Sequence, residues 1–222
     1  MSSVEQVTKM LSVTDGRDKA YKFLQGATKA LAYYTSDPAT SSKIDKLSKS
    51  IGEGRSIMRL GKWTSNIQKM DALNQKAMKK GGWNQLLVIE FLRVLGDMGY
   101  VIGDNSAYLS KYRILSTDPK LCTKYGKISQ FWGFFCQIIL DIIAVISLDA
   151  SKPTYAEDRQ AALLSITKNT SDILVILSVV GYLPKSIYSV NAGVAGILVS
   201  ISGAIATYQN WTKAAPSKPK SE

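Results

Sequence analysis

Amide and carboxylate side chains are the groups in this sequence whose spacing could support chemistry. Gln130, Gln137 and Asp141 recur at intervals of seven and four residues, so a helix would present all three on one face. They lie in a run of otherwise apolar residues, where polar groups usually face protein or a water-filled cavity. This face therefore fits two interpretations, a channel for small metabolites or a packing contact inside a helical bundle.

Catalysis is the function with the least support in the sequence. The 222 residues include no histidine, which removes the commonest general base and the commonest metal ligand. Asp97 and Asp104 could share a helix face, but no nucleophile with a base and no glycine-rich phosphate loop accompanies them. Cys122 and Cys136 show no metal-ligand pairing. The sequence therefore predicts a protein that is not an enzyme and that holds neither a metal nor a cofactor.

A basic stripe and an apolar stripe run side by side at helical spacing between Glu53 and Met70. The basic stripe consists of Arg55, Arg59, Lys62 and Lys69, and the apolar stripe of Ile57, Leu60, Trp63, Ile67 and Met70. We expect them on one helix from about Ser42 to Lys80. Gly54 and Gly61 each cost such a helix about 1 kcal/mol relative to alanine, so it would form mainly at an interface. The pattern is typical of a helix lying on an anionic phospholipid membrane, although a core-facing stripe in a bundle would look alike.

The positive charge alone does not indicate a nucleic-acid partner. The net charge is +11, and the basic residues are concentrated in residues 1–127. Apart from Trp63, however, the aromatic residues lie mostly in apolar segments, and no recognised nucleic-acid-binding module is present. We therefore expect a membrane surface and no nucleic acid.

Two apolar segments are long enough to cross a bilayer. A helix over Ile128 to Leu148 would measure about 31 Å and one over Ile187 to Tyr208 about 33 Å, both close to the hydrocarbon thickness. Two buried helices of a soluble bundle are the alternative. A third run, Ile173 to Leu183, is too short to span alone unless it ends a longer helix that starts near Tyr155. The sequence thus predicts an all-α integral membrane protein with N-terminal amphipathic helices and about two transmembrane helices.

Small residues recur every four positions in the second apolar segment. Ala192, Gly196, Ser200 and Ala204 form a ridge on which a partner helix can pack closely in lipid. This ridge favours association, either with the first span or with another copy of the chain in a homo-oligomer.

The charge distribution predicts the orientation. The region before the first span and the tail with Lys213, Lys218 and Lys220 are basic, which places both on the cytosolic side. The expected organisation is a cytosolic-facing basic amphipathic region, a transmembrane helix, a lumenal loop and helix, a second transmembrane helix and a cytosolic tail, over residues 1–127, 128–148, 149–186, 187–208 and 209–222.

Prolines and capping residues predict the remaining helices. One should open at Asp15, a second should cover Trp83 to about Tyr112, and a third should start after Pro153, with Thr154 and Glu157 as a capping box. The beginning of the chain lacks a long apolar core and does not resemble a secretory signal.

Several short motifs, in order along nearly the whole chain, resemble the peroxin-11 family of the peroxisomal membrane. They are Thr14-Asp15-Gly16-Arg17-Asp18-Lys19 with Leu24-Gln25, then Arg59-Leu60-Gly61-Lys62, Asp104-Asn105, Leu109-Ser110-Lys111, Phe131-Trp132, and Tyr208-Gln209-Asn210-Trp211 after the small-residue ridge.

The resemblance implies a membrane protein that elongates and helps to divide peroxisomes, with the amphipathic helix as the remodelling element and both termini in the cytosol. It also implies recruitment of the fission machinery, including a dynamin-like GTPase, and a link to metabolite passage. The sequence looks most like members from kinetoplastid protists, whose peroxisomes are called glycosomes. The tail Lys218-Pro219-Lys220-Ser221-Glu222 departs from the paired-lysine endings of some members, so coatomer binding is not implied.

Overall fold

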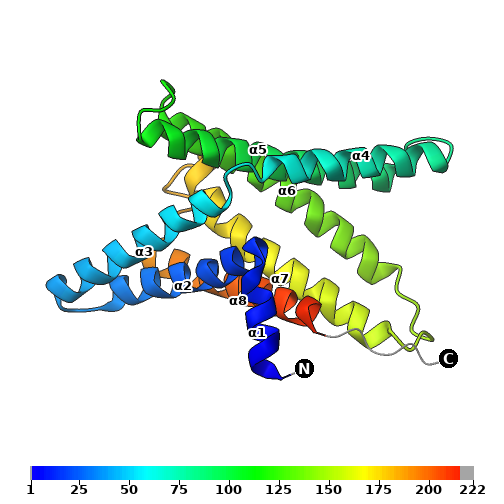
Figure 1. Ribbon diagram of the computed structural model, residues 1–222, viewed down its shortest axis with the longest axis horizontal. Helices are drawn as coiled ribbons and strands as arrows, with labels where there is room; N and C mark the ends of the chain where they lie inside the picture. The colour runs from blue at the N-terminus through cyan, green and yellow to red at the C-terminus, as the bar shows by residue number, and fades with distance from the viewer. Residues whose placement is uncertain (1, 216–222) are drawn as a thin grey trace. The chain divides into compact units, whose positions relative to one another are not determined.

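Eight helices form the secondary structure of residues 2–215, which are the residues that this computed structural model describes (Figure 1). They are α1 (Ser3–Ser12), α2 (Thr14–Tyr34), α3 (Pro38–Met58), α4 (Trp63–Lys79), α5 (Gln85–Lys111), α6 (Pro119–Ile146), α7 (Tyr155–Val180) and α8 (Ala192–Ala214). The described residues contain no β-strand. The prediction of an all-α fold is confirmed.

The chain divides into two units, each with its own helix contacts. Residues 2–58 and 192–215 form the first unit, with α1, α2, α3 and α8. Residues 59–191 form the second unit, with α4 to α7.

Small residues bring α2 and α8 together in the first unit. A Cβ atom added to Gly26 would lie 2.4 Å from the backbone nitrogen of Ser200, and one added to Gly203 would lie 2.5 Å from that of Phe23. Such close approach is possible only where a side chain is absent. α3 packs on α2, since the Ser48 hydroxyl of α3 donates to the Gln25 carbonyl oxygen of α2 at 3.0 Å.

Capping groups define the starts of two helices in this unit. Ser2 and Glu5 form a reciprocal capping box at the start of α1, a helix that the sequence analysis did not predict. Asp37 precedes α3 and accepts hydrogen bonds from the hydroxyl and the backbone N–H of Thr40, which hold the pKa of Asp37 below its usual value.

Glycines also set the contact between α5 and α6 in the second unit. Gly96 faces Gly133 and Gly103 faces Gly126, and a Cβ added to Gly96 or to Gly103 would lie 2.6 Å from the partner's Cα atom. The contacts of α5 with α4 are made by larger side chains, a core of Leu73, Ala77, Leu87 and Val94.

The predicted continuous helix from Ser42 to Lys80 is wrong. α3 ends at Met58 and α4 begins at Trp63, and the intervening turn has Gly61 at φ +74°, in the left-handed region that favours glycine. Gly61 was expected only to weaken the helix. It ends the helix because the turn around it is held by contacts from elsewhere in the second unit.

Three helices among the described residues are long and apolar enough to cross a membrane, namely α6, α7 and α8. α6 covers the first expected span except for Ser147 and Leu148. α8 begins only at Ala192, so residues 187–191 of the second expected span lie outside the helix. α7 begins at Tyr155 and ends at Val180, so residues 173–180 of the run that looked too short form the end of a 26-residue helix. The start of this helix was predicted correctly, but Thr154 makes no side-chain capping hydrogen bond.

Candidate functional site

Two of the four residues in the predicted basic stripe are held in ion pairs inside the fold. Arg59 is 6% exposed, and its Nε and Nη2 atoms donate to Oδ2 and Oδ1 of Asp104, each at 3.1 Å. Its guanidinium also lies 5.6 Å from the centre of the Tyr100 ring. In the first unit, Arg55 Nε donates to Asp18 Oδ1 at 2.9 Å. Both arginines therefore have carboxylate partners within their own units and stabilise the fold.

The turn that contains Arg59 is fixed by a second residue of α5. With its amide oriented to satisfy both groups, Asn105 donates to the Arg59 carbonyl oxygen at 3.1 Å and accepts from the Gly61 N–H at 3.3 Å. The motifs Arg59-Leu60-Gly61-Lys62 and Asp104-Asn105, 45 residues apart, thus form one contact. Another motif residue, Asp18, is the partner of Arg55.

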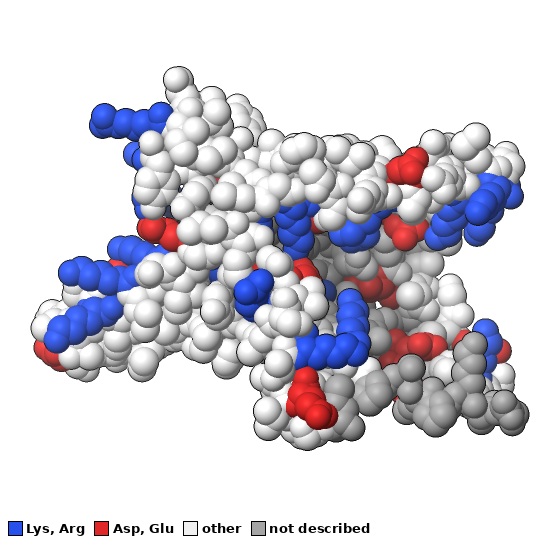
Figure 2. All heavy atoms as spheres, in the orientation of Figure 1, with Lys and Arg blue, Asp and Glu red and all other residues white. Residues whose placement is uncertain are grey.

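The lysines of the stripe lie on the second unit. Lys62 ends the turn and is half-buried, whereas Lys69 is exposed on α4, where its Nζ lies 3.4 Å from Asn66 Oδ1. Figure 2 shows Lys and Arg side chains gathered along one edge of α4, while the neighbouring surface of α4 and α5 is mostly uncharged. The charged and apolar surfaces expected of a membrane-binding helix are therefore both present on α4.

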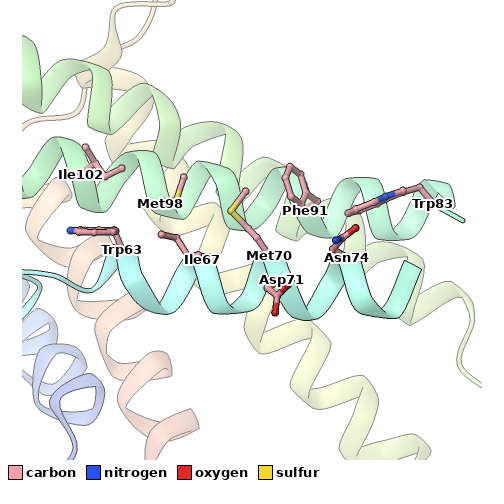
Figure 3. Close-up of a pocket in the computed structure, with 9 residues that line it drawn as sticks. All are labelled: Trp63, Ile67, Met70, Asp71, Asn74, Trp83, Phe91, Met98 and Ile102. Carbon is pink, nitrogen blue, oxygen red and sulfur yellow. The ribbon is translucent and has the colours of Figure 1, made fainter. Parts of the chain in front are cut away.

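The apolar stripe is divided by the turn. Ile57 belongs to α3 and Leu60 to the turn, and both are exposed. Trp63, Ile67 and Met70 lie on α4 and line a groove of about 650 Å³ that α5 borders on its other side (Figure 3). Trp63 is 38% exposed and Ile67 is 50% exposed, so this part of the apolar stripe is open to its surroundings.

The small-residue ridge of α8 lies partly in the contact with α2. Gly196 approaches Ala30, and a Cβ added there would lie 2.5 Å from the Ala30 nitrogen, while Ser200 approaches Gly26. Ala192 and Ala204 were expected on the same ridge, but both are exposed. The small residues of α8 that contact α2 are spaced by three and four residues rather than strictly by four. They are Gly193, Gly196, Ser200 and Gly203.

The polar face of α6 is hydrogen-bonded within the second unit. Asp141 accepts from Gln137 Nε2 at 2.8 Å and from Asn169 Nδ2 of α7 at 3.4 Å, and it is 8% exposed. Gln130 accepts from Lys127 Nζ at 2.9 Å. This arrangement agrees with a packing role for Gln137 and Asp141. Asn169 was not among the residues predicted from the sequence, although an amide in the apolar part of a helix is itself a signal for such a partner.

The remaining predicted residues concern a metal site and the basic tail. Within residues 2–215, no group of three or more cysteine or acidic side chains is placed to hold a metal ion. Lys213 lies in the last turn of α8, whereas Lys218 and Lys220 of the predicted tail lie outside the described residues.

These features define a class of protein: an all-α membrane protein with candidate spanning helices and a separate helix, α4, that carries exposed apolar and basic residues. The sequence profile of the family Peroxisomal biogenesis factor 11 matches residues 4–211, and the chain belongs to this family. It is 24% identical to a Peroxisomal membrane protein 11 homolog of Dictyostelium discoideum over 249 aligned positions, which cover 95% of each protein. No solved structure matches the chain. The predicted family is therefore confirmed, and it is a family of biogenesis factors rather than a known class of enzymes.

Proposed function

We propose that this protein elongates the peroxisomal membrane and promotes its division by inserting the apolar face of α4 into the cytosolic leaflet. The observation that carries the proposal is the exposure of Trp63 and Ile67 on a helix with lysines along one edge. A helix inserted at this shallow depth takes up headgroup area without filling the acyl region, which favours curvature. Family membership supports a role in peroxisome biogenesis.

The energies involved are sufficient for reversible insertion. Leu60, Trp63 and Ile67 would each gain about half of the 1.5–3 kcal/mol of full burial, or about 2–4 kcal/mol together. Lys62 and Lys69 would each add up to about 1 kcal/mol beside anionic lipid. Because the fold already orders α4, little of this energy is needed to form the helix.

Recruitment of partners completes the proposal. Several copies of the chain acting together would concentrate the curvature, and a dynamin-like GTPase would complete the division. The exposed surfaces of the protein would supply the contacts with other copies of the chain and with the GTPase.

The proposed orientation has both termini in the cytosol, so an even number of helices crosses the membrane. Packing favours α6 and α7 as that pair. Asp141, near the end of α6, meets Asn169 in the middle of α7. Trp132 Nε1, in the middle of α6, donates to the Tyr182 hydroxyl at 3.1 Å just after α7 ends. α8, by contrast, packs on α2, which carries Arg17, Asp18 and Lys22. A helix with these charges is poorly suited to the bilayer interior.

Cysteine labelling of intact organelles tests this orientation. With Cys122→Ser and Cys136→Ala as background, Ser186→Cys should react with a membrane-impermeant maleimide, whereas Lys152→Cys should react only after permeabilisation. Protection of both positions would instead support α6 and residues 187–208 as the crossing pair. Labelling of Lys152→Cys without permeabilisation would contradict both arrangements.

Vesicle deformation tests the proposed function. The purified full chain should tubulate vesicles that contain anionic phospholipid, and Ile67→Glu should abolish the effect because it places a charge on the inserting face. Gln68→Glu makes the same charge change at the next exposed position of α4 and should leave the deformation intact. Equal deformation by Ile67→Glu and by the unmodified chain would refute the proposal.

A further inference from the structure

The groove beside α4 has two apolar walls. α4 contributes Trp63, Ile67 and Met70, and α5 contributes Phe91, Met98 and Ile102 (Figure 3). At about 650 Å³ it lies within the size range of pockets that bind small organic molecules. Two polar residues, Asp71 and Asn74, also line it. Figure 3 shows Asp71 pointing away from α5, and its Oδ2 accepts from Gln75 Nε2 at 2.8 Å.

The charged residues of α5 lie on a different face from its groove residues. Phe91, Met98 and Ile102 are spaced by seven and four residues and share one face, whereas Glu90, Arg93, Asp97 and Asp104 are spaced by three, four and seven and share another. The charged contact between α4 and α5 lies on the charged face of α5 and not in the groove. Lys76 Nζ lies 3.4 Å from Glu90 Oε2 on the charged side, and neither residue lines the groove. The α4–α5 hairpin therefore has one apolar surface and one charged surface.

The contacts with α6 place this hairpin at the edge of a candidate span. α5 touches α6 at Gly126 and Gly133, on either side of Lys127, the last charge before the apolar run of α6. A helix held at that level lies near the boundary between headgroups and acyl chains. Trp63 and Trp83 lie at opposite ends of the groove (Figure 3), and tryptophan is enriched at this boundary.

We propose that the element that enters the membrane is the α4–α5 hairpin rather than α4 alone, and that the groove between its helices takes up phospholipid acyl chains. This inference rests on the proposed function and extends it to a second helix. The apolar groove excludes the headgroup, while the lysines along the edge of α4 remain in reach of anionic headgroups. Two inserted helices occupy more headgroup area than one, so the hairpin bends the leaflet more strongly.

Tryptophan quenching tests whether acyl chains reach the groove. The full chain carrying Trp63→Phe, Trp132→Phe and Trp211→Phe retains Trp83, which is 46% exposed. Reconstituted in vesicles of phosphatidylcholine and phosphatidylinositol, it should lose most of its fluorescence when the acyl chains carry bromine. Fluorescence that is unchanged by bromine would overturn the inference.

Substitution of α5 separates this inference from the proposed function. Ile102 is 44% exposed and lines the groove, so Ile102→Glu should weaken vesicle deformation roughly ten-fold without unfolding the chain. Gln85→Glu makes the same charge change at the exposed start of α5 and should have no such effect. Circular dichroism verifies that the variants are folded. If Ile67→Glu abolishes deformation while Ile102→Glu leaves it unchanged, the hairpin inference fails and the proposed function stands. If neither substitution matters, both fail.

Discussion

Gly96→Ala is expected to destabilise the protein, although alanine is the better helix former. The added Cβ would lie 2.6 Å from the Cα and nitrogen of Gly133 and 2.7 Å from the Ser129 carbonyl oxygen. All three are backbone atoms, so only a movement of α5 away from α6 can relieve the contact. Overpacking of this kind costs typically about 1–3 kcal/mol and outweighs the gain of about 1 kcal/mol from helix propensity.

Gly54→Ala is the matched control for this substitution. Gly54 lies within α3, and a Cβ added there would meet no atom within 4 Å. The helix propensity of alanine should therefore raise the stability by up to about 1 kcal/mol. Chemical unfolding in detergent, followed by circular dichroism, measures both variants. Equal stabilisation by the two substitutions would show that α5 and α6 do not pack through their glycines.

Asp104→Ala is expected to destabilise the protein strongly, because it breaks the buried ion pair with Arg59. The side chain of its partner Arg59 is only 7% exposed, so the substitution leaves a charge that water cannot solvate. Removing one partner of a buried pair costs about 3–5 kcal/mol. Loss of the ion pair also frees the turn at Gly61. This turn helps to fix the start of α4.

Asp45→Ala provides the comparison for Asp104→Ala. Asp45 pairs with Lys49 at 2.6 Å, but their side chains are 45% and 73% exposed, so its loss should cost under about 1 kcal/mol. Replacing both Arg59 and Asp104 with leucine should recover most of the lost stability, because it removes the unpaired charge. A cost for Asp104→Ala as small as that for Asp45→Ala would mean that Arg59 is accessible to water.

The fold class follows from local pattern, whereas the break in the amphipathic helix does not. Apolar runs and prolines identify α6, α8 and the start of α7, because hydrophobic period and turn chemistry are local properties. Gly61 alone is a weak signal for the end of a helix, since glycine costs a helix only about 1 kcal/mol. What ends the helix is the contact of the turn with Asp104 and Asn105, more than 40 residues away, which no local pattern contains.

The candidate site was predictable in its apolar half and only partly in its basic half. Trp63, Ile67 and Met70 lie on one helix face, as their spacing predicts. Arg55 and Arg59 carry the same charge in the sequence as Lys62 and Lys69, but their partners Asp18 and Asp104 come from other helices. Arginine forms bidentate pairs with carboxylates more readily than lysine does, which is the one signal that separates the two pairs of residues.

Peroxisome number in living cells shows whether this protein acts by inserting α4 into the membrane. In cells that lack their own family member, the unmodified chain and Gln68→Glu should restore many small peroxisomes. Ile67→Glu should reach the peroxisomal membrane in equal amount and leave the organelles few and large. If Ile67→Glu restores the number of peroxisomes as fully as the unmodified chain does, insertion of α4 is not how this protein acts.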